Sequence, residues 1–213
     1  MTSRTYAVLL ADVLGSSSRP GIRRLLGQRL AQASQRHQRN KWIRLPYSVT
    51  AGDEFQTLTD RLESVPAIIL DLRRTLQPLP IRIGVGFGRV SERIQAPVNR
   101  LGGEAFQYAR QAIEGVKTSQ RFRFLVLTSF QTSEQEFDTT ANLIYGLQDT
   151  LVRKITAKQW ETIDAFMDQP GIEQVAKRLR VNISTVSRNL KRGYYWQLSE
   201  TAAVVKTLIE HTF

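Results

Sequence analysis

Two aspartates stand at positions where a carboxylate can take part in chemistry. Asp12 follows an apolar run that predicts a strand, and Asp53 lies in a Gly-Asp pair between two short strand-like segments. In a sheet where these strands are neighbours, the two carboxylates lie side by side. Paired carboxylates bind Mg²⁺ ions, which in turn hold a triphosphate. Each aspartate also has a simpler interpretation, because Asp12 suits a cap or turn and Asp53 suits the hairpin turn itself.

The loop after Asp12 is suited to phosphate. It contains Gly15, Ser16 and Ser17 and leads through Pro20 into a predicted helix, whose first turn tolerates proline. Backbone N–H groups in such a loop can surround phosphate oxygens. Gly84, Gly86 and Gly88 resemble a glycine-rich phosphate loop only superficially. They alternate within a predicted strand, so we expect close backbone packing there.

The elements that must position these residues follow from hydrophobic periodicity. An apolar run predicts a strand at 5–11, and apolar residues with a period of two predict one at 81–88. Further strands are predicted at 47–51 and 54–59, on either side of the Gly-Asp turn, and at 122–128. Helical periodicity is found at 22–38, 64–76 and 103–117. The hairpin around Gly52–Asp53 makes the sheet mixed. The pattern predicts an α+β fold, in which a ferredoxin-like mixed sheet is layered against helices over residues 1–150. A small all-α domain is predicted for residues 151–213.

Charge and composition limit the partners. The 213 residues include 30 Lys+Arg and 19 Asp+Glu, for a net charge of +11, which favours polyanions and nucleic acid first among them. The chain has no cysteine, which excludes a disulfide, a thiol nucleophile and a cysteine zinc site, and its two histidines exclude a histidine-rich metal site. We expect no haem, flavin or zinc. The apolar runs are too short to span a bilayer, so we expect a cytoplasmic protein without membrane contact.

The segment 171–193 resembles the helix-turn-helix of bacterial regulators. Its two predicted helices are joined by a turn at 180–182 that includes Asn182, a residue type that tolerates the left-handed conformation. The inward positions are apolar: Val175, Ala176, Leu179, Val186 and Leu190. The outward positions of the second helix carry hydroxyl and cationic donors suited to phosphates and base edges: Ser184, Thr185, Ser187, Arg188, Lys191 and Arg192.

This resemblance implies DNA as a partner. Because one recognition helix covers few base pairs, we expect a homodimer that reads two half-sites. A plain three-helix packing module with a solvated basic face is the simpler alternative. Tyr194, Tyr195 and Trp196 follow the second helix, and we expect them to pack against it rather than to stack on bases. The arginines of helix 22–38 either touch DNA or form an ordinary solvated face.

Four short motifs resemble those of class III nucleotidyl cyclases, in the same order. They are Asp12–Ser17, Ala51–Phe55, Ile81–Gly86 and Gly103–Ala109. The second motif differs by one residue from the Gly-Gly-Asp-Glu-Phe signature of diguanylate cyclases, which share this palm fold. Taken together with the helix-turn-helix, the whole chain looks most like the SatD family. The resemblance implies that Asp12, Asp53 and the carbonyl of Val13 bind two Mg²⁺ or Mn²⁺ ions. It also implies that Gly15, Ser16, Ser17 and Gln107 contact a nucleotide such as an NTP.

The chain departs from the cyclase pattern at three positions. Val49 stands where a purine-reading lysine is usual, and Gln107 and Gln111 stand where an asparagine and an arginine are usual. A neutral Gln111 supplies no charge to a phosphoryl transition state. Its neighbour Arg110 points about 100° away on the helix. Glu54, next to Asp53 in the strand, is expected to point away from the site.

Three functions are consistent with the residues. In the first, a DNA-binding regulator of transcription carries a palm domain that binds a metal–nucleotide or a related phosphorylated ligand. In the second, the palm is an enzyme, a nucleotidyl cyclase or nucleotidyltransferase that uses two Mg²⁺ ions. In the third, a catalytically dead palm is a dimerisation scaffold for the DNA-binding part.

Overall fold

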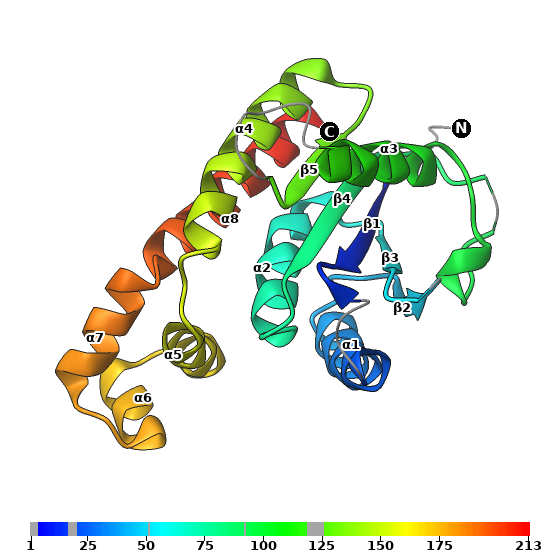
Figure 1. Ribbon diagram of the computed structural model, residues 1–213. Helices are drawn as coiled ribbons and strands as arrows, with labels where there is room; N and C mark the ends of the chain where they lie inside the picture. The colour runs from blue at the N-terminus through cyan, green and yellow to red at the C-terminus, as the bar shows by residue number, and fades with distance from the viewer. Residues whose placement is uncertain (1–3, 17–20, 51, 92, 119–125) are drawn as a thin grey trace.

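A single mixed sheet of five strands is the centre of the fold. The structure is a computed structural model and describes residues 4–16, 21–50, 52–91, 93–118 and 126–213. The strand order is β2-β3-β1-β4-β5, and Figure 1 shows helices on both faces of the sheet. All neighbouring strands are antiparallel except β4 and β5, which are parallel. The predicted α+β fold with a mixed sheet is therefore confirmed.

The strand bounds agree with the predicted segments over most of the sheet. The strands are β1 (Tyr6–Val13), β2 (Leu45–Val49), β3 (Phe55–Thr59), β4 (Ile81–Gly88) and β5 (Thr128–Gln131). Most of the predicted strand 122–128 lies outside the described residues, and β5 begins where that prediction ends. β5 is the last strand along the chain in the part that the structure describes.

The described residues also form eight α-helices and two short 3-10 helices. The α-helices are α1 (Ile22–Arg39), α2 (Val65–Thr75), α3 (Glu104–Thr118), α4 (Gln135–Val152), α5 (Ala157–Asp168), α6 (Ile172–Leu179), α7 (Ile183–Arg192) and α8 (Tyr195–Thr212). The 3-10 helices are η2 (Leu62–Ser64) and η3 (Val98–Arg100). Helix α4 was not predicted from the sequence. None of the described helices is both long enough and apolar enough to cross a membrane.

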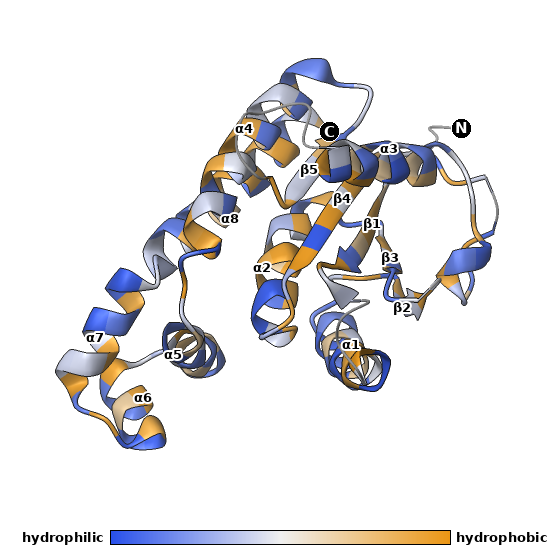
Figure 2. Ribbon diagram, viewed as in Figure 1, coloured by the Kyte–Doolittle hydropathy of each residue, from blue (hydrophilic) through white to orange (hydrophobic). Residues whose placement is uncertain are grey.

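Alternation along β1 divides the core into two layers. Ala7, Leu9 and Ala11 point to one face, where they join a hydrophobic cluster with α1, α2, α4 and the end of α8. Val8 and Leu10 point to the opposite face, where α3 and η3 supply the partners. In Figure 2, hydrophobic and hydrophilic residues alternate along α4 and α8, as expected for helices that each bury one side.

Two glycines of β4 let α3 lie directly on the sheet. A Cβ atom at Gly84 would come within 2.5 Å of the backbone of Ala109 and Ile113. A Cβ atom at Gly86 would collide with the backbone of Ala105 and Ala109. Real Cβ atoms do not approach backbone so closely, so only glycine fits at either position. This confirms the expected packing role of the alternating glycines and fixes the helix that carries Gln107, Arg110 and Gln111.

The C-terminal helices form a second cluster and then return to the first. Trp160, Ile163, Val175, Val186 and Leu190 form a core of their own between α5, α6 and α7. Further along α8, Val205 and Ile209 are buried in the core of the sheet domain. Figure 1 shows α8 running back beside α4. The division at residue 150 stays a prediction. The hydrophobic clusters place the last half of α8 with the sheet.

Candidate functional site

The carboxylate of Asp12 lies at the end of β1 and is held by an arginine. In the β1–β4 register Asp12 stands opposite Arg82, and Arg82 donates from Nε and Nη2 to the two carboxylate oxygens, at 2.8 and 3.0 Å. Asp12 is almost fully buried. The ammonium group of Lys117, from α3, lies 3.7 Å from the same carboxylate. Two cations therefore already balance the charge of Asp12.

The hairpin between β2 and β3 brings Asp53 to the same end of the sheet. Gly52 has a φ of +65°, which suits glycine in the tight turn before Asp53. The carboxylate of Asp53 accepts a hydrogen bond from the backbone N–H of Val13, at 3.1 Å. The structure thus places Asp53 against the residue that follows Asp12, so the expected proximity of the two strand ends is seen.

Glu54 forms an ion pair that sequence analysis did not predict. Arg110 of α3 donates from both terminal nitrogens to its carboxylate, at 2.7 and 2.9 Å, and Thr50 donates at 2.9 Å. Burial would raise the pKa of Glu54, but the bonds from Arg110 and Thr50 outweigh it, so the pKa of this carboxyl lies below its usual range. The bond to Glu54 in turn raises the pKa of Arg110.

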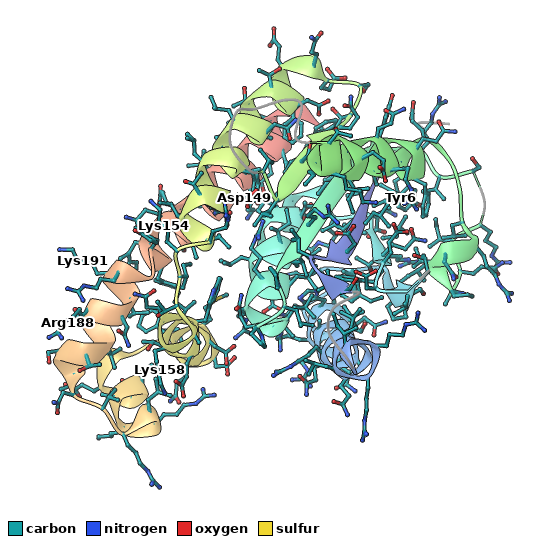
Figure 3. The ribbon with its side chains drawn as sticks, in the orientation of Figure 1. Tyr6, Asp149, Lys154, Lys158, Arg188 and Lys191 are labelled. Carbon is teal, nitrogen blue, oxygen red and sulfur yellow. The ribbon has the colours of Figure 1, made fainter. Side chains whose placement is uncertain are left out.

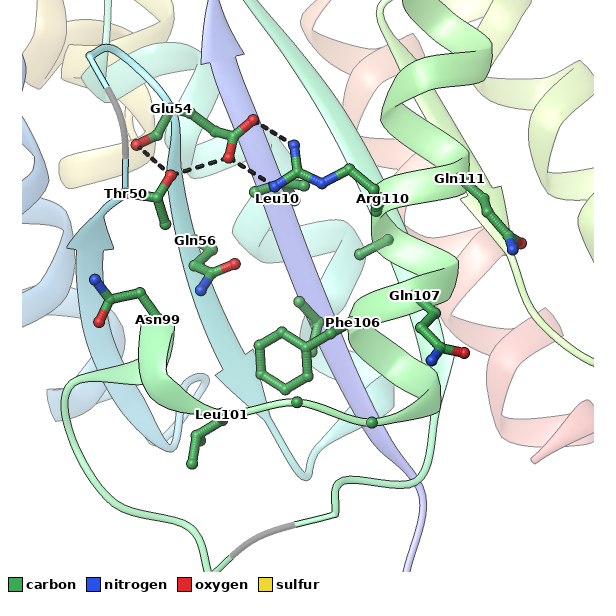
Figure 4. A pocket seen from close by; sticks show the side chains of 14 residues that line it. Leu10, Thr50, Glu54, Gln56, Asn99, Leu101, Phe106, Gln107, Arg110 and Gln111 are labelled. Carbon is green, nitrogen blue, oxygen red and sulfur yellow. Dashed lines mark hydrogen bonds and ion pairs between the residues drawn. The ribbon is translucent and has the colours of Figure 1, made fainter.

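The expectation that Glu54 points away from the site is wrong. β3 runs antiparallel to β1 with Gln56 opposite Leu10 and Phe55 opposite Ala11, so the next residue, Glu54, shares the face of Asp12. Arg110 and Gln111 do lie on different sides of α3, as expected from the helical rotation (Figure 4). Of these two neighbours, it is therefore Arg110 that faces the sheet.

A pocket of about 890 Å³ opens beside this ion pair, on the face of the sheet that α3 only partly covers. Its apolar wall comes from Val8, Leu10, Leu101 and Phe106, and its polar wall includes Thr50, Gln56 and Asn99. Figure 4 shows Phe106 and Arg110 reaching from α3 over the strands, with Glu54 and Thr50 at the far rim. Pockets of 300–1,000 Å³ typically hold small-molecule ligands.

The residues present do not fit the expected pair of metal ions. Arg82 binds both oxygens of Asp12, and Asp53 is bonded to backbone. A cation close to Lys117 and Arg82 would also be repelled. We therefore derive no catalytic step through a metal at this place.

Comparison with known proteins now gives the family. A family comparison matches residues 6–201 to the SatD family. The chain belongs to the SatD family. Among curated proteins no match was found.

Several solved structures resemble this SatD-family chain in part. The guanylyl cyclase domain of the RhoGC fusion protein from the aquatic fungus Blastocladiella emersonii is 17% identical, covers 53% of this chain and 74% of its own, and gives a TM-score of 0.43. A bacterial light-regulated adenylyl cyclase is 16% identical over 61% of this chain and 77% of its own, with a TM-score of 0.42. The adenylyl cyclase CyaB from P. aeruginosa is 15% identical over 50% and 70%, at 0.38.

The other predicted site residues of the SatD-family chain, the metal ligand Val13 and the nucleotide contacts, are spread around this end of the sheet. Val13 is buried in β1, and Gly15 and Ser16 form the turn after it. Ser17 lies outside the described residues. Gln107 is exposed at the edge of the pocket, on the side of α3 away from Phe106 (Figure 4). The contact of Gly15, Ser16, Ser17 and Gln107 with a nucleotide stays a prediction.

Sequence analysis missed Arg82 and Lys117, and a signal for each was present. The even positions of β4 are Arg82 and three glycines, so Arg82 was the one side chain able to reach across that face. Lys117 lies seven residues after Arg110, two helical turns along the same side of α3. Each could have been found by drawing the register of the sheet beneath the helix.

The α6–α7 segment of the SatD-family chain has the amphipathic arrangement that was predicted. Val175, Val186 and Leu190 are buried, and the outward residues of α7 are exposed except Thr185, which is half-buried. The turn differs in detail: Arg180 takes the left-handed conformation, with φ of 55°, and Asn182 is the extended residue just before α7. Tyr194 and Tyr195 pack on the cluster of α5–α7, as expected, while Trp196 is half exposed.

Proposed function

We propose that this SatD-family chain is a cytoplasmic DNA-binding regulator in which α7 contacts DNA and the sheet domain binds a phosphorylated ligand of the nucleotide class. The observation that carries the proposal is the outer face of α7. Ser184, Ser187, Arg188, Lys191 and Arg192 are all exposed. In the described part of the chain, the three cations of α7 form no ion pair, since no carboxylate oxygen lies within 4 Å of their nitrogen atoms. Figure 3 shows Arg188 and Lys191 projecting outward from α7.

The arrangement of α6 and α7 supports this assignment. Three residues join the helices, and the small side chain of Ala176 lies where they meet. Val186 and Leu190 hold α7 against its neighbours, so its polar side is free to enter a major groove. Arginine and lysine contact guanine edges and phosphates, and serine contacts either. Because one helix covers few base pairs, we propose that a homodimer binds two half-sites.

Loss of a cation from α7 should weaken DNA binding. We expect Arg188→Ala or Lys191→Ala to lower the affinity for a selected binding site about 10- to 100-fold, since a base contact contributes roughly 1–3 kcal/mol. Fluorescence anisotropy with a duplex selected from a random pool measures this. The control is Lys206→Ala, which removes an exposed lysine of α8 that is paired with Glu210. Equal affinity of wild type and both α7 variants would contradict the proposal.

The ligand proposed for the sheet domain rests on the pocket beside Glu54 and Arg110. Its volume suits a nucleotide, Phe106 offers an aromatic face to a base, and the amides of Gln56 and Asn99 can pair with base edges. Arg110 can exchange its carboxylate partner for a phosphate, to which guanidinium groups bind in the same two-pronged way. Because Asp12 is already paired with Arg82, we propose that binding needs no metal ion.

Phe106 should therefore control nucleotide affinity. We expect Phe106→Ala to weaken binding of ATP or GTP by roughly 10-fold or more, because stacking contributes about 1–3 kcal/mol per base. Isothermal titration calorimetry with and without Mg²⁺ measures the effect. The control is Trp196→Ala, an exposed aromatic of α8 that does not line the pocket. Unchanged affinity in Phe106→Ala, or binding only with Mg²⁺, would contradict this assignment.

The same samples test the enzyme hypothesis. Mass spectrometry of wild type incubated with each NTP and Mg²⁺ or Mn²⁺ would reveal a cyclic or oligomeric nucleotide if the palm were catalytic. Absence of product in wild type is expected here, because Gln111 is neutral and Asp12 is held by Arg82. A product that disappears in Asp53→Asn would instead make the chain a nucleotidyl cyclase or nucleotidyltransferase. Binding of DNA without any nucleotide binding would favour the dead scaffold.

A further inference from the structure

One stretch of the sheet domain carries basic residues and no acidic ones. Between Asp12 and Asp53 the sequence has no aspartate or glutamate. It does have these cations: Arg19, Arg23, Arg24, Arg29, Arg36, Arg39, Lys41 and Arg44. The stretch contains α1 and β2, so most of the net charge of +11 lies on one part of the fold.

Most of these cations that the structure describes have no carboxylate partner among the described residues. Arg36 is the exception, because it points inward to Asp71. We call the remaining described cations of this stretch the α1 surface: Arg23, Arg24, Arg29, Arg39, Lys41 and Arg44. In the described parts of the chain no carboxylate lies within 4 Å of any of them, and all except the half-buried Arg29 are exposed.

The cations elsewhere in the sheet domain behave differently. Most of them are paired with a carboxylate on the same domain: Arg4, Arg61, Arg73, Arg74, Arg82, Arg89, Arg110 and Lys117. The unpaired charge is therefore a property of the α1 surface rather than of the whole domain. A concentration of unpaired cations attracts a polyanion.

The neutral side chains of the α1 surface also favour a phosphate backbone. The exposed positions between the arginines of α1 include amide side chains: Gln28, Gln32, Gln35 and Gln38. Amides donate hydrogen bonds to phosphate oxygens, and arginine binds phosphate with two donors. The 18 residues of α1 extend about 27 Å, so they can follow several phosphates of one duplex.

A lipid surface is the less suitable partner. An interfacial helix inserts a free apolar face between lipid headgroups. The apolar face of α1 is not free, because Leu26, Leu30 and Ala33 are buried in the core of the sheet domain. The large exposed hydrophobic side chains of the described residues do not include any from α1.

From this charge complementarity we infer that the α1 surface is a second DNA-contacting surface, which binds the phosphates of duplex DNA without reading its sequence. The inference rests on the proposed DNA-binding function and extends it to the sheet domain. In Figure 1, α1 lies at the lower edge of the sheet domain, and α6 and α7 lie at the lower edge of the helical part. The α1 surface thus adds phosphate contacts to those of α7 and raises the salt dependence of binding.

The salt dependence of DNA affinity tests this inference. Full-length wild type and Arg24→Gln/Arg39→Gln are titrated with a random-sequence duplex of about 36 bp, over roughly 50–200 mM salt. Each neutralised phosphate contributes about 0.9 to the slope of log affinity against log salt. We expect the double variant to lose about 2 from the slope and about ten-fold in affinity at low salt. The matched control is Arg93→Gln/Arg100→Gln, which removes two exposed arginines of the β4–α3 connection.

The outcomes separate this inference from the proposed role of α7. An unchanged slope in Arg24→Gln/Arg39→Gln, or an equal loss in the control pair, would overturn the inference while leaving α7 unaffected. Weaker DNA binding by Arg24→Gln/Arg39→Gln, together with full DNA affinity in Arg188→Ala, would support the α1 surface and contradict the role of α7. The inference would also be overturned if wild type bound phosphatidylserine vesicles but not DNA, and if Arg24→Gln/Arg39→Gln bound those vesicles more weakly. Urea unfolding checks that each variant is folded, and Arg23→Gln/Arg44→Gln replaces any that is not.

Discussion

Asp149→Ala should lower the free energy of unfolding by about 3–5 kcal/mol, because it removes one partner of a fully buried ion pair. The carboxylate of Asp149 accepts hydrogen bonds from the backbone N–H groups of Leu127 and Thr128, each at 2.7 Å, and pairs with Arg73. Arg73 is itself only 3% exposed. Without Asp149, a buried guanidinium and two buried N–H groups lose their acceptor. Urea unfolding followed by circular dichroism measures the change.

A surface pair provides the control for this experiment. Glu161→Ala breaks the exposed ion pair with Lys158 on α5, and we expect a loss below about 1 kcal/mol. Arg73→Met combined with Asp149→Ala should cost less than the sum of the two single changes, because the buried charges are then removed together. A loss below about 1 kcal/mol for Asp149→Ala alone would show that this carboxylate does not hold α4 to β5 as described.

Local patterns were enough to predict most of the sheet. The apolar run of β1, the alternation along β4 and the Gly52–Asp53 turn predicted four strands and the mixed arrangement, because hydrophobic pattern and turn chemistry are local properties. Helix α4 was missed. Its inward side carries Asp149 and Asn142, which accept hydrogen bonds from the backbone of β5 that could not be anticipated from apolar periodicity.

The site was predicted less completely, since it depends on which residues face one another across strands. Asp12 and Asp53 were placed at the correct end of the sheet from the order of the elements. The partner of Asp12 is Arg82, which belongs to a strand 70 residues away, and only the β1–β4 register brings the two together. Glu54 was assigned to the wrong face for the same reason: its direction follows from pairing with β1.

The return of α8 to the sheet domain was also beyond local reasoning. The sequence after residue 151 contains only helical patterns, which favoured a separate domain. Val205 and Ile209 look like any inward residues of an amphipathic helix, but they are buried against the core of the sheet. Periodicity identifies a buried side of a helix without identifying what covers it.

The second large effect is a loss of folding stability in acid, which we expect from the polar network that joins α1, α2 and α5. Asp71 is 2% exposed and accepts hydrogen bonds from Arg36 and Arg74, and its Oδ2 atom lies 2.7 Å from Nε2 of the buried His37. Burial would raise the pKa of Asp71, but the bonds to His37 and Arg36 and the charge of Arg74 outweigh it. The pKa of this carboxyl is therefore held well below its usual range.

The sign of the pH dependence follows from that lowered pKa. The unfolded chain binds a proton at Asp71 near pH 3.9, about the usual pKa of an aspartate, while the folded chain does so only at lower pH. The stability from Asp71 is thus fully present above about pH 5 and decreases as the pH falls through the unfolded pKa towards the folded one. We expect Asp71→Asn to cost about 3–5 kcal/mol at pH 7, with a smaller difference from wild type at pH 3.

Urea unfolding of wild type and Asp71→Asn between pH 3 and 7 measures this difference, and Asp164→Asn is the matched control. Asp164 accepts a hydrogen bond from the same Arg74 at 2.8 Å but is half exposed, on α5. Its loss should cost less than about 1 kcal/mol. A difference between wild type and Asp71→Asn that stays constant over this range would mean that the protonation of Asp71 does not contribute to stability. A difference that decreases with acid would show that the ionised carboxylate of Asp71 stabilises the fold by balancing the cations of α1 and α2.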